Sequence, residues 1–291
     1  MTSEPNTIPE FTSFNIRPLT GSLGAEILDT DLSHASDEEI AQVQQALDHY
    51  HVLAIRDQKL DPNSFHKLAR RFGPFSGNPV HVPLEGFDDL VRFTREAEDR
   101  GPVVGEDLHM DLAWMEIPPG TTILYGEEIP PVGGDTMFAS LSAAYEGLSD
   151  AMRDLIYNLV GVHSGKGVFA LNASHATAFS VKESGQKVDD IETAHPLVCR
   201  HPNTGRKHLY ISRALCRFVG MTEAESKPII DYLITHAQKV EYACRLRWAP
   251  NTLTMWANTC LMHAAINDYS GQRRVVLRTT VAGARPLAAG D

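Results

Sequence analysis

The spacing of apolar residues along the chain predicts strands at both ends and helices between them. Apolar and polar residues alternate in the opening FTSFNIRPLTGSLGAEILDTDLS, around Gly21 and Gly24, and again near the C-terminus in VEYACRLRW, TLTMWAN and RRVVLRTTVAG. A period of two residues is typical of strands with one buried face. The pattern therefore predicts a mostly antiparallel β core that carries helices.

Helical periodicity and helix-capping residues mark four further segments. Ser36 is a candidate N-cap, and Glu39 completes a capping box with it. Pro62 stands in the first turn of the second segment and Gly73 at its end, as helices prefer. Thr222 is the candidate cap of the last segment. The predicted helices cover residues 36–51, 61–73, 140–159 and 222–239.

Residues 163–193 lack apolar periodicity and are rich in Gly, Ser and Ala. A segment of this length without secondary structure is usually functional or disordered. We expect a lid over a site, with an ordered insertion at a subunit contact as the alternative. No repeat, low-complexity tract or linker divides the sequence, so residues 1–291 are expected to form a single domain.

Composition and charge narrow the class of protein. The chain has 291 residues, of which 43% are hydrophobic and 22% charged, as in globular domains. A net charge of -11 argues against nucleic-acid and anionic-membrane partners. No signal peptide or membrane-spanning apolar run is visible, and the four cysteines are widely spaced. We expect a cytoplasmic protein with reduced thiols.

His109 and Asp111 stand two residues apart in the stretch GEDLHMDLAW. With 13 histidines and 37 acidic residues in the chain, about one or two such pairs arise by chance, so the pair alone is weak. On an extended strand both side chains would share a face and could reach one metal ion, while Met110 would point into the core. Two histidines and one carboxylate, with three positions left open, favour Fe(II) oxygenase chemistry.

His263 is the best candidate for the third ligand, because two arginines follow it on a strand-like segment. Arg274 and Arg278 have even spacing, so both guanidinium groups lie on one face. Arginines on an apolar strand are costly unless they meet anions, and arginine binds carboxylates in bidentate geometry. The alternative is a pair of structural salt bridges to local acids.

These residues resemble a known family. The stretches HMD, PPVGGDTMFASLSAAYEGLS, HPNTGRKHLYIS, CRLRW and MHAAINDYSGQRRVVLRTT are similar to those of the taurine dioxygenase family of Fe(II)/2-oxoglutarate-dependent dioxygenases. The resemblance is greatest to its aryloxyalkanoate (phenoxypropionate) dioxygenase branch, and it covers almost the whole chain. It implies a mostly β fold with flanking α-helices, the double-stranded β-helix or jelly roll.

The resemblance also implies a cofactor set of Fe(II), 2-oxoglutarate and O2. The residues that match the iron ligands are His109, Asp111 and His263, and those that match the 2-oxoglutarate site are Thr136, Arg274 and Trp256. From the residues alone, Trp256 could equally be a core aromatic. The family further implies a homo-oligomer, a dimer or a tetramer.

The expected substrate is a small organic acid. Arg278 matches the arginine that faces the substrate's anionic group, and Gly105 and Leu112 flank the ligands. Asn78 stands where taurine-type members have a histidine, and Trp114 replaces a common phenylalanine. These departures favour a carboxylate with an apolar or aromatic body over taurine, and they leave alkyl sulfonates, sulfates and natural-product acids open. A zinc hydrolase and a non-catalytic binding barrel are the competing hypotheses.

Overall fold

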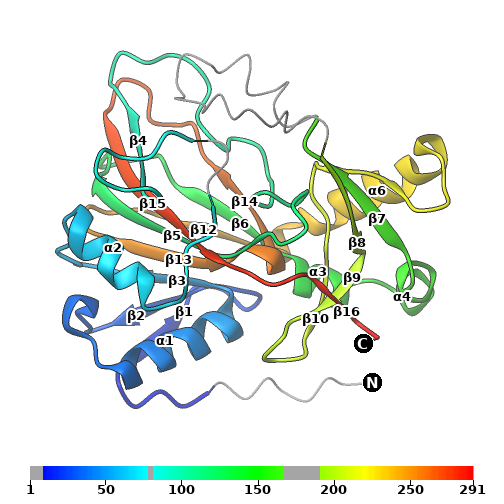
Figure 1. The fold of residues 1–291 in the computed structure, drawn as a ribbon, viewed down its shortest axis with the longest axis horizontal. Coiled ribbons are helices and arrows are strands. Elements are labelled where there is room, and N and C mark those ends of the chain that lie inside the picture. Colours follow the sequence, from blue (N-terminus) through cyan, green and yellow to red (C-terminus); the bar gives the residue numbers. More distant parts are fainter. Residues whose placement is uncertain (1–8, 78–80, 167–190, 291) are drawn as a thin grey trace.

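The structure, a computed structural model, describes residues 9–77, 81–166 and 191–290 (Figure 1). Its largest element is a seven-stranded sheet in which only the β2–β3 pair is parallel. In spatial order the strands are β1 (Asn15–Pro18), β2 (Ala25–Leu28), β3 (Val52–Ile55), β13 (Leu253–Ala257), β5 (Pro119–Glu128), β15 (Arg274–Ala282) and β4 (Val91–Arg95). Strands from both ends of the chain thus share one sheet, as the sequence predicts.

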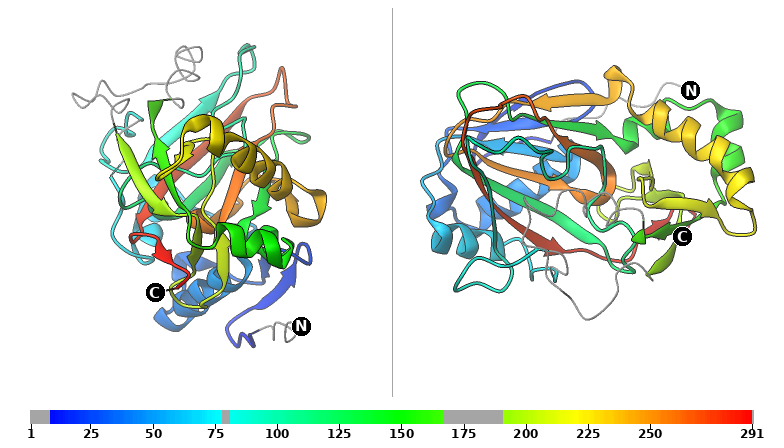
Figure 2. Two further views of the ribbon diagram at one scale, coloured as in Figure 1. Left: turned by 90° about the vertical axis from the view of Figure 1, so that its right-hand side faces the viewer. Right: turned by 90° about the horizontal axis from the view of Figure 1, so that it is seen from above.

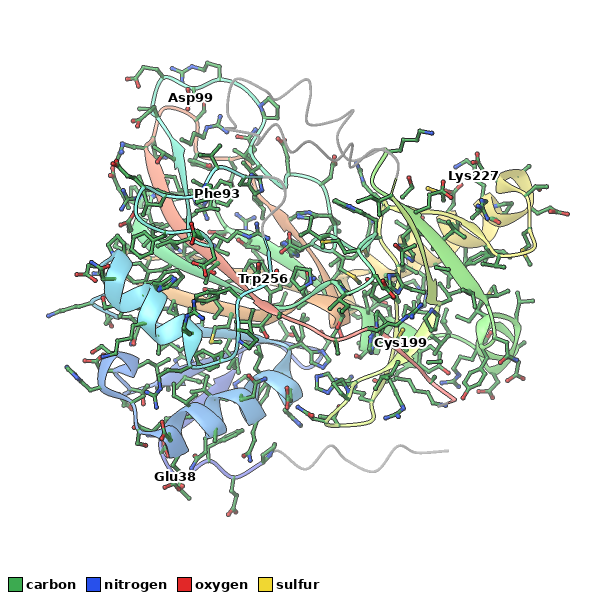
Figure 3. The ribbon with its side chains drawn as sticks, in the orientation of Figure 1. Glu38, Phe93, Asp99, Cys199, Lys227 and Trp256 are labelled. Atoms are coloured by element: carbon green, nitrogen blue, oxygen red, sulfur yellow. The ribbon has the colours of Figure 1, made fainter. Side chains whose placement is uncertain are left out.

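A second, three-stranded sheet packs against the inner face of the first. Its strands are β12 (Ala243–Leu246), β6 (Thr136–Ser140) and β14 (Leu261–Ala265), and all pairs are antiparallel. Phe138 of this sheet and Val276 of the large sheet belong to one buried cluster with Trp248 and Trp256. Trp256 accordingly lies in the middle of the fold (Figure 3). The core between the two sheets therefore contains an aromatic group to which both sheets contribute.

Two helices cover the outer face of the large sheet, namely α1 (Asp37–Tyr50) and α2 (Pro62–Arg70). Ser36 and Glu39 form the predicted capping box, with the Ser36 hydroxyl accepting from the Glu39 backbone N–H at 3.1 Å. Pro62 stands in the first turn of α2, as predicted. Val43 of α1 and Phe65 of α2 are fully buried against the sheet, so the helices fix its outer surface.

Three helices and two small sheets pack together at the opposite end of the molecule from α1 and α2 (Figure 2). The helices are α3 (Leu141–Glu146), α4 (Asp150–Ile156) and α6 (Glu223–Ala237), with the short 3-10 turns η1 (Leu32–His34), η3 (Val240–Tyr242) and η4 (Asn258–Cys260) elsewhere in the chain. Two small sheets contain β10 (Lys207–Leu209), β9 (Val198–Arg200) and β16 (Leu287–Ala288), and β11 (Leu215–Phe218), β7 (Val160–Ser164) and β8 (Glu192–Pro196). None of the helices in the described ranges is long and apolar enough to cross a membrane.

The helix predicted over 140–159 is divided into α3 and α4. A Cβ at Gly147, between them, would stand 1.9 Å from the Tyr242 hydroxyl, so this position packs against a residue far along the chain. The Ser149 hydroxyl then accepts from the Met152 backbone N–H at 3.3 Å and caps α4. The expected lid falls mainly on residues 167–190, which lie outside the described residues.

Candidate active site

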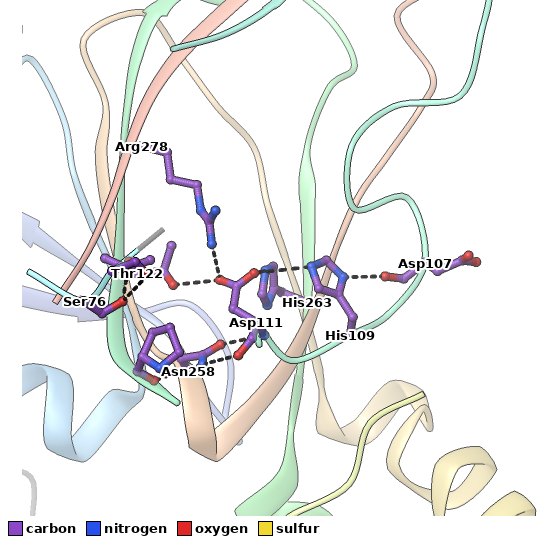
Figure 4. A network of polar contacts seen from close by, with 11 residues as sticks. Ser76, Asp107, His109, Asp111, Thr122, Asn258, His263 and Arg278 are labelled. Atoms are coloured by element: carbon purple, nitrogen blue, oxygen red, sulfur yellow. Dashed lines mark hydrogen bonds and ion pairs between the residues drawn. The ribbon is translucent and has the colours of Figure 1, made fainter. Parts of the chain in front are cut away.

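His109 and His263 lie directly opposite each other in an antiparallel bridge at the edge strand β14. The His109 N–H donates to the His263 carbonyl at 3.0 Å, and the His263 N–H donates to the His109 carbonyl at 2.8 Å. Their imidazole centroids are 4.3 Å apart, and the ring of Trp256 lies 4.6 Å from that of His263. Backbone pairing therefore places the two imidazoles side by side at the edge of the β12–β6–β14 sheet (Figure 4).

Asp111 reaches the same point, although not from the extended strand that the sequence analysis assumed. The chain leaves the bridge after His109, and Asp111 begins a turn in which Leu112 has a left-handed φ of 48°. Asp111 Oδ1 nevertheless lies 3.6 Å from His109 Nε2 and 3.7 Å from His263 Nε2. One donor atom from each of the three residues lies within 4.8 Å of the others, and Met110 is buried in the core as predicted.

The backbone of Asp111 is held by the side chain of Asn258, which sequence reasoning missed. The Asn258 Oδ1 accepts from the Asp111 N–H at 2.9 Å, and its Nδ2 donates to the Asp111 and Pro119 carbonyls, each at 3.0 Å. Asn258 is completely buried. The Asn258 amide thus binds both backbone groups of Asp111, as a neighbouring strand would do if Asp111 were extended.

The second carboxylate oxygen of Asp111 is bound by two donors. The Thr122 hydroxyl donates to Oδ2 at 2.8 Å, and the Arg278 guanidinium lies 2.8 Å from the same oxygen. Burial by itself would raise the pKa of Asp111, but the Arg278 guanidinium, followed by the neighbouring His263 and His109 imidazoles, holds this pKa well below its ordinary value. The carboxylate is therefore anionic, with Oδ1 turned toward the imidazoles.

Each histidine is oriented as a nitrogen donor. His109 Nδ1 lies 2.7 Å from the Asp107 carbonyl, so this nitrogen carries the proton and the Nε2 lone pair faces Asp111. Burial, followed by the nearby His109, lowers the pKa of His263 to about 3, which keeps this ring neutral. Gly105 has φ +70°, and a Cβ there would stand 2.8 Å from His109 Cε1. The backbone of Gly105 therefore packs directly on the His109 ring.

A second polar group surrounds Arg274, which lies on β15, the strand that also carries Arg278. Its Nε is buried and has no hydrogen-bond partner among the residues that the structure describes. The guanidinium lies over the rings of Trp248 and Tyr269, 5.5 and 5.9 Å from their centroids. Burial lowers the pKa of Arg274 from its ordinary value, although Tyr269 and Asp135 oppose the shift. A charged group in such surroundings is suited to an anionic ligand.

Gly134 and Trp248 adjoin the Arg274 side chain, and Trp248 in turn contacts Thr136. A Cβ at Gly134, where φ is +70°, would stand 3.2 Å from Arg274 Cδ. Trp248 Nε1 donates to the Thr136 hydroxyl oxygen at 2.9 Å. Because that bond uses an acceptor site of Thr136, the hydroxyl proton is available to a further acceptor. The GGDT motif thus combines a close backbone approach with a positioned hydroxyl donor.

The other residues singled out in the sequence have different surroundings. Trp114 is buried in the hydrophobic cluster that contains Met110 and Tyr210, and Leu112 packs at the edge of that cluster. Asn78 lies outside the described residues. His81, which sequence reasoning missed, packs edge-on against Phe93 at 4.9 Å. Burial, and then the charge of Arg278, lowers its pKa to about 3, so His81 is a neutral neighbour of the Arg278 guanidinium.

Two facing sheets with two imidazoles and one carboxylate converging between them are the arrangement expected of a metal-dependent oxygenase. Comparisons with known proteins agree. The family model described as taurine catabolism dioxygenase TauD, TfdA family, matches residues 15–280. The chain belongs to this TauD/TfdA family and is a 2-oxoglutarate-dependent dioxygenase.

Individual relatives match over nearly the whole chain. An alkylsulfatase of Acinetobacter baylyi is 32% identical over 92% of this chain and 84% of its own length. The (S)-phenoxypropionate/alpha-ketoglutarate-dioxygenase of Sphingobium herbicidovorans is 28% identical over 93% of this chain and 96% of its own. The crystal structure of a taurine dioxygenase from Burkholderia xenovorans superimposes with a TM-score of 0.78 at 30% identity, covering 95% of this chain and 93% of that one. The predicted family and the jelly-roll fold are confirmed.

Proposed function

We propose that His109, Asp111 and His263 bind one Fe(II) ion and that the enzyme hydroxylates a C–H bond of a small organic anion with an apolar body. The observation that carries this proposal is the convergence of two imidazole nitrogens and one carboxylate oxygen within 4.8 Å. The other polar side-chain atoms of His109 and Asp111 are already bound by protein groups, so each of these residues presents one remaining donor atom toward His263 Nε2.

The donor set fits iron. Two neutral imidazoles and one carboxylate are the ligands of non-haem Fe(II) oxygenases, and they leave positions for a cosubstrate and O2. Zinc in a hydrolase would use similar ligands, but it would give the buried Arg274 and the positioned Thr136 hydroxyl no task. When bound, the iron would catalyse the oxidative decarboxylation of 2-oxoglutarate to succinate and CO2, which is coupled to oxidation of the substrate.

Arg274 and Thr136 are proposed to hold the far carboxylate of 2-oxoglutarate. Among the described residues the buried Arg274 Nε has no hydrogen-bond partner and the Thr136 hydroxyl proton has no acceptor, and both facts support this role. The rings of Trp248 and Tyr269 restrict the guanidinium, which reduces the entropy lost on binding. Trp256 is proposed to line the same pocket, because it packs against His263.

Arg278 is proposed to anchor the anionic group of the substrate. One of its nitrogens is paired with Asp111 Oδ2, and a guanidinium has five N–H donors, so others remain for a second anion. Gly105 and Leu112, which flank the proposed ligands, are proposed to shape the wall of the substrate pocket, as the sequence analysis predicts. Trp114, expected there too, is buried in the cluster of Met110 and Tyr210. We place a carboxylate with an apolar or aromatic body first.

A sulfate ester is the second candidate substrate. The alkylsulfatase relative and the neutral His81 imidazole beside Arg278 both favour it, since a sulfate has more acceptor oxygens than a carboxylate. Matched compounds distinguish the two candidates. Phenoxypropionate, octyl sulfate, octanesulfonate, taurine and neutral octanol are supplied separately, and succinate release is measured together with substrate loss. A preference for octyl sulfate would select the second candidate, and a preference for octanol would contradict the anion anchor.

The metal and cosubstrate are tested without turnover. Anaerobic addition of Fe(II) and 2-oxoglutarate to the purified protein should produce a weak visible charge-transfer band. Zn(II) in place of Fe(II) is the control and should give no band. Absence of the band with Fe(II) at saturating 2-oxoglutarate would contradict the proposed function.

A further inference from the structure

We propose that Thr122 is a positioning residue that fixes the rotation of the Asp111 carboxylate, so that Oδ1 alone faces the two imidazoles. This inference rests on the proposed metal site. It assigns to a strand hydroxyl the task of making Asp111 a one-oxygen ligand, and it deepens the proposed function without depending on the identity of the substrate.

Thr122 sits at a rigid place in the molecule. It lies within β5, between β13 and β15, where Trp256 and Thr280 are its cross-strand partners. Its side chain is completely buried, and β-branched residues have few χ1 rotamers in a strand. The hydroxyl proton is directed at Asp111 Oδ2, 2.8 Å away (Figure 4). The hydroxyl is therefore fixed by the sheet before any ligand binds.

The two oxygens of Asp111 have different partners. Oδ2 is bound by the Thr122 hydroxyl and the Arg278 guanidinium, each at 2.8 Å. Oδ1 lies 3.6 and 3.7 Å from the imidazole nitrogens of His109 and His263. A metal that bound both oxygens would compete with the Thr122 hydroxyl and the Arg278 guanidinium for Oδ2. One-oxygen binding keeps those hydrogen bonds, and it leaves the remaining positions of the metal open.

Asn258 cannot fix this rotation, because it holds only the backbone N–H and carbonyl of Asp111. The torsions of the side chain are therefore determined by the donors at Oδ2. Arg278 is long, and the proposed function gives it a second anion to bind. Thr122 is short, neutral and buried, so it retains Oδ2 when the guanidinium is shared with a substrate.

The experiment compares Thr122→Val with Thr122→Ser and Thr254→Val. Valine keeps the shape of threonine and removes the hydroxyl, and serine restores the hydroxyl. Thr254 is the matched control, because it is completely buried on the neighbouring strand β13 and its hydroxyl has no hydrogen-bond partner among the described residues. Co(II) is the probe, since its visible spectrum reports coordination geometry, and the titration needs neither 2-oxoglutarate nor substrate.

Thr122→Val should weaken Co(II) binding roughly tenfold and change its visible spectrum, as loss of a hydrogen bond to a ligand does. Thr122→Ser and Thr254→Val should resemble the unmodified protein. Under turnover at saturating metal, Thr122→Val should lower kcat and leave the substrate KM unchanged. If the valine variant proves unstable, Thr122→Ala also removes the hydroxyl and does not add a second methyl group as valine does.

Two results would overturn the inference: an unchanged Co(II) affinity and spectrum in Thr122→Val, or an equal change in Thr254→Val. Asp111→Ala separates this failure from that of the proposed function. If Asp111→Ala bound Co(II) as tightly as the unmodified protein, the metal site itself would be wrong. If Asp111→Ala lost Co(II) binding and Thr122→Val bound Co(II) like the unmodified protein, the metal site would be supported and the positioning role of Thr122 would be wrong.

Discussion

His109 and His263 exchange their backbone hydrogen bonds, so main-chain pairing brings two imidazoles from distant parts of the chain to one place. Asp111, the third member of the group, has no strand partner. Its position depends on the side chains of Asn258, Thr122 and Arg278. Substitutions around the aspartate are therefore expected to affect the site more selectively than substitutions around the bridge.

Alanine at His109, Asp111 or His263 is expected to abolish turnover, because each change removes one of three proposed ligands. Succinate release with added Fe(II) measures the effect. Circular dichroism should show a retained fold, since the backbone pairing of His109 and His263 survives the loss of their rings. Near-normal activity in any of the three variants would remove that residue from the ligand set.

Gly105→Ala is expected to weaken metal binding by about tenfold or more, because its Cβ would stand 2.8 Å from His109 Cε1 and would displace the ring. Gly205→Ala is the matched control, since Gly205 has φ +69° and no atom within 4 Å of the added Cβ. Both variants should lose roughly 1–2 kcal/mol of stability from the left-handed backbone. Equal Co(II) affinities in the two variants would show that contact with His109 does not matter.

Arg274→Ala is expected to raise the 2-oxoglutarate requirement strongly, because a buried carboxylate contact is worth roughly 2–5 kcal/mol. Thr136→Val should cost about 1–2 kcal/mol, and Thr136→Ser should restore most of it. The charge-transfer band, titrated with 2-oxoglutarate, measures both effects directly. An unchanged titration in the Arg274 variant would place the cosubstrate elsewhere.

Arg278→Ala is expected to raise the KM of an anionic substrate far more than that of 2-oxoglutarate. Because Arg278 also pairs with Asp111 at 2.8 Å, the variant should bind metal more weakly, and assays need saturating Fe(II). A neutral analogue of the best substrate serves as the control, because it has no anionic group for Arg278 to bind. The anion anchor would be refuted by an unchanged KM for the charged substrate.

The metal-free protein is expected to lose stability as the pH falls below 6.5. Burial lowers the pKa of His163 and of His208 to about 3, and it lowers the pKa of His51 well below the ordinary value. These rings stay neutral in the folded protein and take up protons when it unfolds. The free energy of unfolding therefore falls between pH 6.5 and about pH 3, by up to about 1.4 kcal/mol per histidine and pH unit.

Urea unfolding in EDTA at pH 7.5, 6.5 and 5.5 measures how the free energy of unfolding changes with pH. His163→Asn should reduce this slope by the contribution of one histidine, up to about 1.4 kcal/mol per pH unit. The chosen range lies above the window in which carboxylates titrate. A free energy of unfolding that is equal at pH 7.5 and pH 5.5 would mean that the buried histidines take up protons without unfolding.

Local signals in the sequence predict the helices well. Ser36 with Glu39, and Thr222 with Glu225, form capping boxes within four residues, so no tertiary information is needed. Between α3 and α4, Gly147 packs against the hydroxyl of Tyr242, almost a hundred residues further along, and the sequence pattern does not contain that contact. The fold class follows from alternation and from the family resemblance, whereas the order of strands in the large sheet depends on pairings between distant segments.

The same distinction applies to the site. His109, Asp111 and His263 are found by spacing, by the arginines that follow and by resemblance, and the structure brings their donor atoms together. Asn258 holds Asp111 across 147 positions of sequence, and no local pattern marks it. The extended geometry assumed for Asp111 was wrong because a turn, closed by a side-chain amide, replaces the strand there.

The bridge between His109 and His263 also has a consequence for biosynthesis. More than half of these 291 residues lie between the two histidines, and β14, which carries His263, is synthesised long after His109 and Asp111. A ribosome that has not yet released β14 therefore presents only two of the three donors. A metal held by all three residues could bind only after β14 has been synthesised, and its binding would then oppose unfolding by holding a very long chain loop closed.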